Sequence, residues 1–115
     1  MYQVLNHILQ DPKDQTEICL IFANVTPADI LLRQDLDRLA AAHPTQFDVY
    51  YVIEKDIPVA WKYGVGYITQ KMIEEHCAPP SEDTLLTWCG PKPMTEAMKK
   101  ISEQMGYAPE CTFKF

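Results

Sequence analysis

A cysteine at the end of an apolar run is the residue of this chain that most clearly could do chemistry. The run over 84–89 has the length of a buried strand, ends in Cys89 and passes directly into Gly90 and Pro91. Proline suits the start of a helix, because its missing N–H would be unsatisfied there in any case. Open α/β sheets build ligand sites in this way, where a strand ends and leads into a helix. The pattern predicts that this turn faces a cofactor.

Two residues of this turn also have a purely structural interpretation. Cys89 could be a buried cysteine that acts as a small hydrophobic side chain. Pro91 could simply begin a helix. The residues by themselves leave these alternatives open.

The elements that must position this turn alternate between helical and strand periodicity. Thr26, Pro27 and Asp29 have the types and spacing of a helix start, with Thr26 as N-cap. We expect, in chain order, a helix over 1–9 that ends before Pro12, a strand over 17–24, a helix from Thr26 through 40 that ends at 43–44, a strand over 47–53, an irregular loop over 54–66, a helix over 69–77, a strand over 84–89, a helix over 91–105 and a strand over 111–115.

This order predicts an α/β fold, namely a three-layer αβα doubly wound parallel sheet. Ligands of such sheets bind beside the carboxyl ends of the strands, so the segments 24–29, 63–66, 89–94 and Phe115 are expected to share one edge. A dinucleotide-binding unit normally begins with a strand and a glycine loop. Here a helix begins at Met1, so that strand and that loop are expected to be missing.

Composition and charge narrow the class of protein. The 115 residues suffice for one domain with a substantial core and are too few for two. The net charge of −6 argues against nucleic acid or an anionic membrane as the main partner, because both are bound through clustered Lys and Arg. The four cysteines lack C-x-x-C spacing and follow no export signal, so we expect free thiols in a reducing, cytoplasmic compartment. A membrane anchor on a longer parent would not be visible from these residues.

Other chemistries find little support in the residues. His7, His43 and His76 have no ligand spacing with the cysteines, so no metal is expected. There is no Gly-x-Ser-x-Gly elbow, no Walker loop and no pair of carboxylates in an acid/base context. A phosphoacceptor receiver would need an acidic cluster at the strand ends, which 22–24 and 88–90 do not provide.

Several separated motifs together are far more specific than any one of them. They are Met1-Tyr2-Gln3-Val4, Phe22-Ala23-Asn24 with Thr26, Asp29-Ile30-Leu31-Leu32-Arg33, Tyr63-Gly64 with Gly66, Cys89-Gly90-Pro91 with Pro93-Met94, and the terminal Phe115. In this order they closely resemble the NADH-binding lobe of the NADH-cytochrome b5 reductase and nitrate reductase flavoproteins, in the ferredoxin-reductase-like superfamily. The resemblance covers essentially the whole chain, 1–115, as one NAD(H)-binding oxidoreductase domain.

The resemblance begins late in the family pattern. In the family a strand, a Gly-x-Gly-x-x-Pro loop and an FAD-binding barrel precede the methionine matched by Met1. The resemblance therefore implies a lobe truncated at its N-terminus, without the FAD-binding domain and without the first strand, which is central in the sheet. That strand would lie between the strands over 17–24 and 84–89. We expect the two edges to pair with each other, to be filled by another chain, or to leave the fragment unstable.

The resemblance also implies an activity. NADH would pass a hydride from nicotinamide C4 to N5 of an FAD held by the missing lobe, and single electrons would then reach a haem protein such as cytochrome b5 or another acceptor. No nucleic acid or membrane contact is expected of this chain. Cys89 is the implied catalytic residue, beside the nicotinamide. The implied cofactor-binding residues are Asn24, Thr26, Asp29, Tyr63, Gly64, Gly66, Cys89, Gly90, Pro91, Pro93, Met94 and Phe115.

Asp29 bears on the choice between the two nicotinamide cofactors. A carboxylate at this position can accept hydrogen bonds from the ribose of NADH and repel the extra phosphate of NADPH, so we favour NADH. Asp29 could instead only complement the helix dipole and complete the cap with Thr26, worth roughly 0.3–1 kcal/mol. Both roles are compatible. In the same way, Trp61 and Tyr63 could cover the adenine or simply hold a long loop.

Two functions from different classes remain open. One is an oxidoreductase lobe, either of the cytochrome b5 reductase type or the C-terminal lobe of a nitrate reductase. The other is a non-catalytic, truncated αβα module with weak or no nucleotide binding. Bound flavin or diaphorase activity would separate them.

Overall fold

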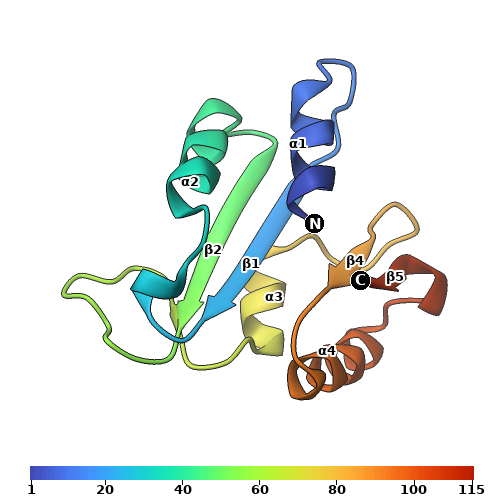
Figure 1. The fold of residues 1–115 in the computed structure, drawn as a ribbon. Helices are drawn as coiled ribbons and strands as arrows, with labels where there is room; N and C mark the ends of the chain where they lie inside the picture. Colours follow the sequence, from blue (N-terminus) through green and yellow to red (C-terminus); the bar gives the residue numbers. More distant parts are fainter. The chain divides into compact units, whose positions relative to one another are not determined.

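The computed structural model describes all residues 1–115, and the chain divides into two compact units, Met1–Ile68 and Thr69–Phe115 (Figure 1). The first unit contains α1 (Tyr2–Gln10), β1 (Ile18–Asn24), a 3₁₀ turn η1 (Pro27–Asp29), α2 (Arg33–Ala42), β2 (Phe47–Ile53) and β3 (Gly64–Val65). The second unit contains α3 (Gln70–His76), β4 (Leu86–Trp88), α4 (Lys92–Met105), a 3₁₀ turn η2 (Pro109–Cys111) and β5 (Thr112–Lys114).

The first unit is built on a parallel three-stranded sheet in the order β1-β2-β3. Ile18 pairs with Phe47 at the start of the β1–β2 ladder, and Asn24 pairs with Ile53 at its end. The short β3 continues this edge, because its Val65 is the second partner of Ile53. The carboxyl ends of all three strands therefore meet, which is where parallel sheets bind ligands.

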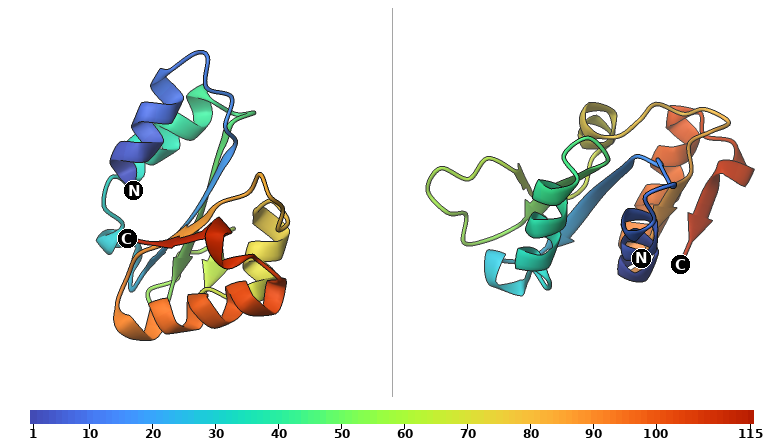
Figure 2. Two further views of the ribbon diagram at one scale, coloured as in Figure 1. Left: turned by 90° about the vertical axis from the view of Figure 1, so that its right-hand side faces the viewer. Right: turned by 90° about the horizontal axis from the view of Figure 1, so that it is seen from above.

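Apolar side chains of both helices and of β2 form the core of the first unit. Alternate residues of a strand point to the same face, so every second residue of β2 reaches this core. Figure 2 shows α1 and α2 together on that side of the β1–β2 ladder. The cluster contains Leu5, Leu9, Ile30, Leu36, Phe47, Val49, Tyr51 and Ile53.

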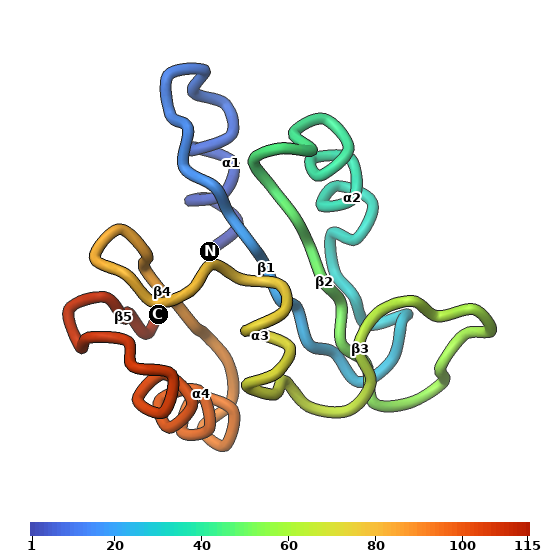
Figure 3. The backbone as a smooth tube through the Cα atoms, turned by 180° about the vertical axis from the view of Figure 1, so that it is seen from behind, coloured from blue at the N-terminus to red at the C-terminus, as the bar shows by residue number.

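The second unit pairs β4 and β5 in parallel, with Leu86 opposite Thr112 and with α4 packed beside β4 (Figure 3). The helix ends at Gly106, whose φ of 91° is the left-handed conformation that glycine favours at a helix end. The next residue, Tyr107, is buried, and its hydroxyl donates to the carbonyl of Ala78 at 3.0 Å. This bond connects the end of α4 to the segment after α3.

The expected α/β class and the parallel strands are confirmed, and the backbone pairing joins the strands in two ladders and not in one continuous sheet. A sheet is continuous only where neighbouring strands exchange backbone hydrogen bonds, and the strands form two separate ladders, β1-β2-β3 and β4-β5. The edges of the strands expected over 17–24 and 84–89 therefore do not pair with each other. That another chain fills these edges, or that the fragment is unstable without one, stays a prediction.

The expected helix from Thr26 is also wrong in its start. The cap residues instead close the short turn η1, and α2 begins only at Arg33. Leu32 has φ 60° and ψ 18°, a left-handed conformation that interrupts the chain between the two elements. The remaining helices and long strands lie within about one to two residues of their expected bounds.

Candidate functional site

The turn after β4 places the predicted cysteine on the surface of the second unit. Trp88 is buried, whereas Cys89 is exposed, so its interpretation as a buried hydrophobic residue is wrong. Gly90 makes room for Met94, because a Cβ at position 90 would lie 2.6 Å from the Met94 sulfur. Pro91 is the N-cap residue of α4, and its carbonyl accepts the first bond of the helix. The thiol therefore lies just before a helix N-terminus, which favours negative charge.

The C-terminal residue belongs to the same end of the second unit. The N–H of Phe115 donates to the carbonyl of Trp88 at 3.0 Å. Phe115 is 50% exposed, and its ring contacts the ring of Phe113 edge-on, with 5.0 Å between the centroids. Phe115 is therefore available to a ligand near Cys89, and Pro93 and Met94 follow in the first turn of α4.

The turn after β1 is closed by the predicted cap. Oδ2 of Asp29 accepts hydrogen bonds from the N–H of Thr26 at 3.1 Å and from its hydroxyl at 2.9 Å. This confirms the structural interpretation of the pair, in the setting of a 3₁₀ turn. Asp29 is exposed, so a ribose could still reach its carboxylate.

The predicted residues of the long loop lie at the same edge of the first sheet as Asn24. Gly64 and Val65 form β3, and the N–H of Gly66 donates to the carbonyl of Ile53 at 2.8 Å. Gly66 has φ +93°, which any residue with a Cβ rarely adopts. Since Ile53 pairs with Asn24 on its other side, these residues form one continuous row.

Glu54 is a candidate that the sequence patterns did not single out. It is exposed and directly follows β2, and the N–H groups of Glu54 and Lys55 both donate to the carbonyl of Val25, at 3.0 and 2.9 Å. Its carboxylate lies, like that of Asp29, beyond the carboxyl end of a parallel strand, where a carboxylate can accept hydrogen bonds from a ribose. The sequence feature that could have identified Glu54 was its position immediately after the apolar run over 47–53.

Two buried donors have no hydrogen-bond partner, and each belongs to the last residue of its strand. They are Nδ2 of Asn24, at the end of β1, and Nε1 of Trp88, at the end of β4. A buried donor without a partner costs about 1–3 kcal/mol, so it usually indicates a ligand, a water or a further chain segment. Both orphaned donors coincide with strand ends chosen as candidate sites.

The structure gathers the predicted residues in two groups, one in each unit. Asn24, Thr26, Asp29, Tyr63, Gly64 and Gly66 belong to the first, and Cys89, Gly90, Pro91, Pro93, Met94 and Phe115 belong to the second. That all of them share one edge stays a prediction. The structure contains no group of three or more His, Cys, Asp or Glu side chains that could hold a metal ion. None of its helices has both the length and the apolar character needed to cross a membrane.

A family model and individual relatives place the chain in the same family. Residues 1–100 match the model of the oxidoreductase NAD-binding domain. The chain is 44% identical over its full length to NADH--cytochrome b5 reductase 1 of Arabidopsis thaliana, and 41% identical to NADH-cytochrome b5 reductase 2 of Homo sapiens. It spans only 41% and 42% of the length of these two relatives.

A solved structure extends the likeness to the fold. The cytochrome b5 reductase domain of Ulva prolifera nitrate reductase superposes with a TM-score of 0.93 at 39% identity. The match covers the whole of this chain and 44% of that one.

Proposed function

Because the chain belongs to the NAD-binding domain family of cytochrome b5 reductase-type oxidoreductases, we propose that it binds NADH and orients the nicotinamide for hydride transfer to FAD. The observation that carries the proposal is the row formed by Asn24, Gly64 and Gly66 at the carboxyl edge of a parallel sheet. The buried Nδ2 of Asn24 fits a nucleotide there, because a ribose or phosphate oxygen would supply its missing acceptor.

The two groups of residues take different parts of the nucleotide in this proposal. Asn24, Asp29 and Glu54 bind the adenosine half, and Gly66 lets it approach the backbone. Cys89 and Phe115 contact the nicotinamide, for which an exposed, polarizable sulfur and an aromatic ring are suitable neighbours. Orientation of the ring is the contribution of Cys89 to catalysis.

FAD supplies the redox chemistry in this proposal, because it accepts a hydride and passes electrons on singly. We assign FAD to residues outside these 115, since the chain spans about two fifths of the matched reductases. In this proposal, this chain's own residues bind the nucleotide and hold its ring.

The names of the relatives support a proposal for the electron acceptor. Two of them are NADH-cytochrome b5 reductases, which favours a haem protein such as cytochrome b5 as the electron acceptor. The likeness to a nitrate reductase domain supports a second acceptor, within a nitrate reductase. A non-catalytic module with little nucleotide affinity is the remaining alternative.

The proposal is tested by titrating the isotope-labelled chain with NADH and with NADPH while recording amide NMR spectra. We expect NADH to shift the amides around Asn24, Gly64 and Cys89, and NADPH to shift them less. In parallel, NADH should slow alkylation of Cys89 by iodoacetamide, with Cys89→Ser as the control for labelling at the other cysteines. A dispersed spectrum that ignores both nucleotides would support the non-catalytic module instead.

The preference for NADH is tested with two matched carboxylates. Asp29→Asn and Glu54→Gln each remove one negative charge without changing side-chain size. The variant that removes the carboxylate beside the ribose should gain affinity for NADPH relative to NADH by about tenfold, the size of one close charge repulsion. Asp29 is our first choice, and a gain in Glu54→Gln alone would transfer the role to Glu54.

A further inference from the structure

Arg33 is held between two aromatic rings that come from different parts of the first unit. Its guanidinium carbon lies 5.2 Å from the ring centroid of Tyr51 in β2 and 5.4 Å from that of Trp61 in the loop over 54–63. A guanidinium over an aromatic face is attracted by the ring quadrupole. One side chain at the start of α2 therefore connects the sheet core with the loop.

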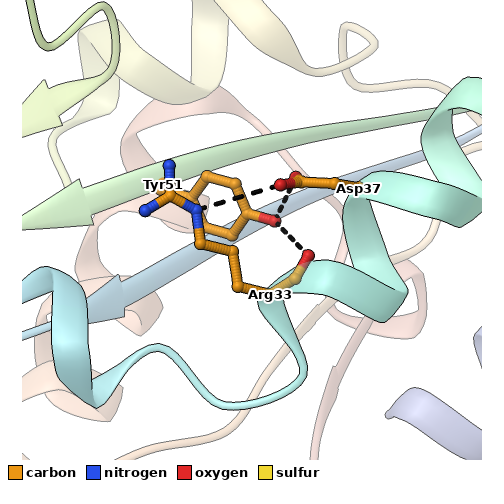
Figure 4. A network of polar contacts seen from close by, with 3 residues as sticks. All are labelled: Arg33, Asp37 and Tyr51. Atoms are coloured by element: carbon orange, nitrogen blue, oxygen red, sulfur yellow. Dashed lines mark hydrogen bonds and ion pairs between the residues drawn. The ribbon is translucent and has the colours of Figure 1, made fainter.

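The position of Arg33 is set by a small polar network (Figure 4). Nε of Arg33 lies 3.8 Å from Oδ2 of Asp37, one helical turn further along α2. The hydroxyl of the buried Tyr51 donates to Oδ1 of the same carboxylate at 2.6 Å. Burial, and then this bond to a carboxylate, raise the pKa of Tyr51.

The loop side of the contact continues into residues proposed to bind the nucleotide. Trp61 Nε1 donates to the carbonyl of Gly64 at 3.1 Å. The ring of Tyr63 packs edge-on against Trp61 and Tyr51, with centroid distances of 5.1 and 5.2 Å. A displacement of Trp61 would therefore also displace Tyr63 and Gly64, which it contacts.

The backbone around this contact adopts unfavourable conformations. Leu32, Asp56 and Ala60 have φ of 60°, 55° and 63°, and they are the only non-glycine residues of the chain with positive φ. One directly precedes Arg33 and the other two lie in the loop. Such conformations persist only where surrounding contacts impose them, and they concentrate at functional segments.

A cleft of about 280 Å³ opens beside Arg33 and is lined by Arg33 and residues 58–63. The contacts of the guanidinium are with Tyr51, Trp61 and Asp37, all of them residues of this chain. These contacts support a role of Arg33 in holding the loop.

We infer that Arg33 is a positioning residue: it holds Trp61, and through it the segment over 61–66, in the conformation that receives the adenosine half of the nucleotide. This inference rests on the proposed function. It assigns to Arg33 a role in affinity that requires no contact with the ligand.

The test compares Arg33→Met, which keeps side-chain length without charge, with Arg38→Met on the same helix. Arg38 is a matched control because it is exposed and pairs only with Asp35, at 3.4 Å. Two quantities are measured on the full chain: the dissociation constant of NADH, and hydrogen exchange of the amides over 54–66 without nucleotide. Trp61→Leu is the second variant and removes the ring from the loop side.

We expect Arg33→Met and Trp61→Leu each to weaken NADH binding by about tenfold and to speed exchange over 54–63. The double variant should bind about as weakly as Trp61→Leu alone, because loss of the ring already removes the contact between Trp61 and Arg33. Arg38→Met should match the wild-type chain in both measurements, and exchange in β1 and β2 should stay unchanged in every variant.

Three results would contradict the inference or the proposed function, and they show which of the two is wrong. Unchanged NADH affinity in Arg33→Met, with the wild-type chain binding, would overturn the inference and leave the proposed function intact. Faster exchange throughout β1 and β2 would also overturn it, because Arg33 would then only stabilise the fold. A folded wild-type chain that ignores NADH would overturn the proposed function, while loop exchange would still show whether Arg33 orders the segment.

Discussion

The two units support their candidate residues in different ways. In the first unit, Asn24, Gly64 and Gly66 border a ladder whose central strand ends in three fully buried residues, Tyr51, Val52 and Ile53. In the second unit, Cys89 and Phe115 follow three-residue strands and are exposed. The proposed adenosine side therefore rests on a buried core, whereas the proposed nicotinamide side rests on a short ladder and one helix. We expect the second group to be the more mobile one.

Truncating one core residue in each unit should give the largest difference. Ile53→Ala removes a side chain with 0% exposure and should lower the free energy of unfolding by about 2–5 kcal/mol. Leu86→Ala in β4 removes a half-buried side chain and should cost about 1–2 kcal/mol. Urea unfolding gives both values, and equal losses would contradict the proposed contrast between the units.

Alkaline pH should affect the two buried tyrosines in the same direction and to different extents. Burial raises the pKa of both Tyr51 and Tyr107, and at Tyr51 the carboxylate of Asp37 raises it further. Both therefore stay protonated in the folded chain when the unfolded chain ionises, so their contribution is complete below about pH 10 and is lost as the pH rises above it.

Phenylalanine variants measure this loss. Tyr51→Phe should cost about 1–2 kcal/mol at neutral pH, from the hydrogen bond to Asp37, and should flatten the fall in stability above about pH 10. Tyr107→Phe, whose hydroxyl donates to a neutral carbonyl, should do less in both respects. Thermal unfolding between pH 7 and 11 provides the comparison, and a larger effect at Tyr107 would reverse our ranking.

Two glycine substitutions should give the smallest losses of stability. They separate two reasons for a glycine: a backbone with positive φ at Gly66, and a close side chain at Gly90. Gly66→Ala should cost about 1 kcal/mol because φ is +93°, and no change of a neighbour should relieve it. Gly90→Ala should cost less than about 1 kcal/mol, because only the flexible end of Met94 is in the way. Adding Met94→Ala should restore the space at position 90, so the step from Gly90 to Ala should then cost less unfolding free energy. If this step costs the same with Met94 and with Ala at position 94, the steric explanation is wrong.

The variants of Gly90 and Met94 also test the proposed function. If Gly90 also lets the nucleotide approach the backbone, Met94→Ala should relieve the local strain without restoring NADH affinity. The measurement is the NADH titration of the single and double variants, with the wild-type chain as reference. Full recovery of affinity in the double variant would assign Gly90 to packing alone.

Much of the fold could be predicted because its longer elements are specified locally. The strand over 47–53 and the helices now seen as α1, α3 and α4 follow from apolar spacing and from clear stops such as Gly106. The break at Leu32 could not be predicted, because a left-handed leucine is unfavourable by itself and is imposed by contacts elsewhere. β3 escaped notice because two residues show no periodicity.

Some residues of the candidate site could be predicted from the sequence, and others could not. The residues at strand ends, including Asn24 and Cys89, were recognisable from motif and position. Glu54 and Arg33 were not singled out for function, since their significance depends on which residues lie beside them in space.

By itself, the sequence determined the α/β class, the parallel strands, the family and the set of residues placed at strand ends, because each of these depends on local spacing or on motifs read along the chain. Only the tertiary structure decided that the strands form two ladders, that Cys89 is exposed, that two donors are left buried without partners, and that Arg33 lies between Tyr51 and Trp61. Pairing, burial and ring contacts join residues far apart in the chain, and no local pattern records them.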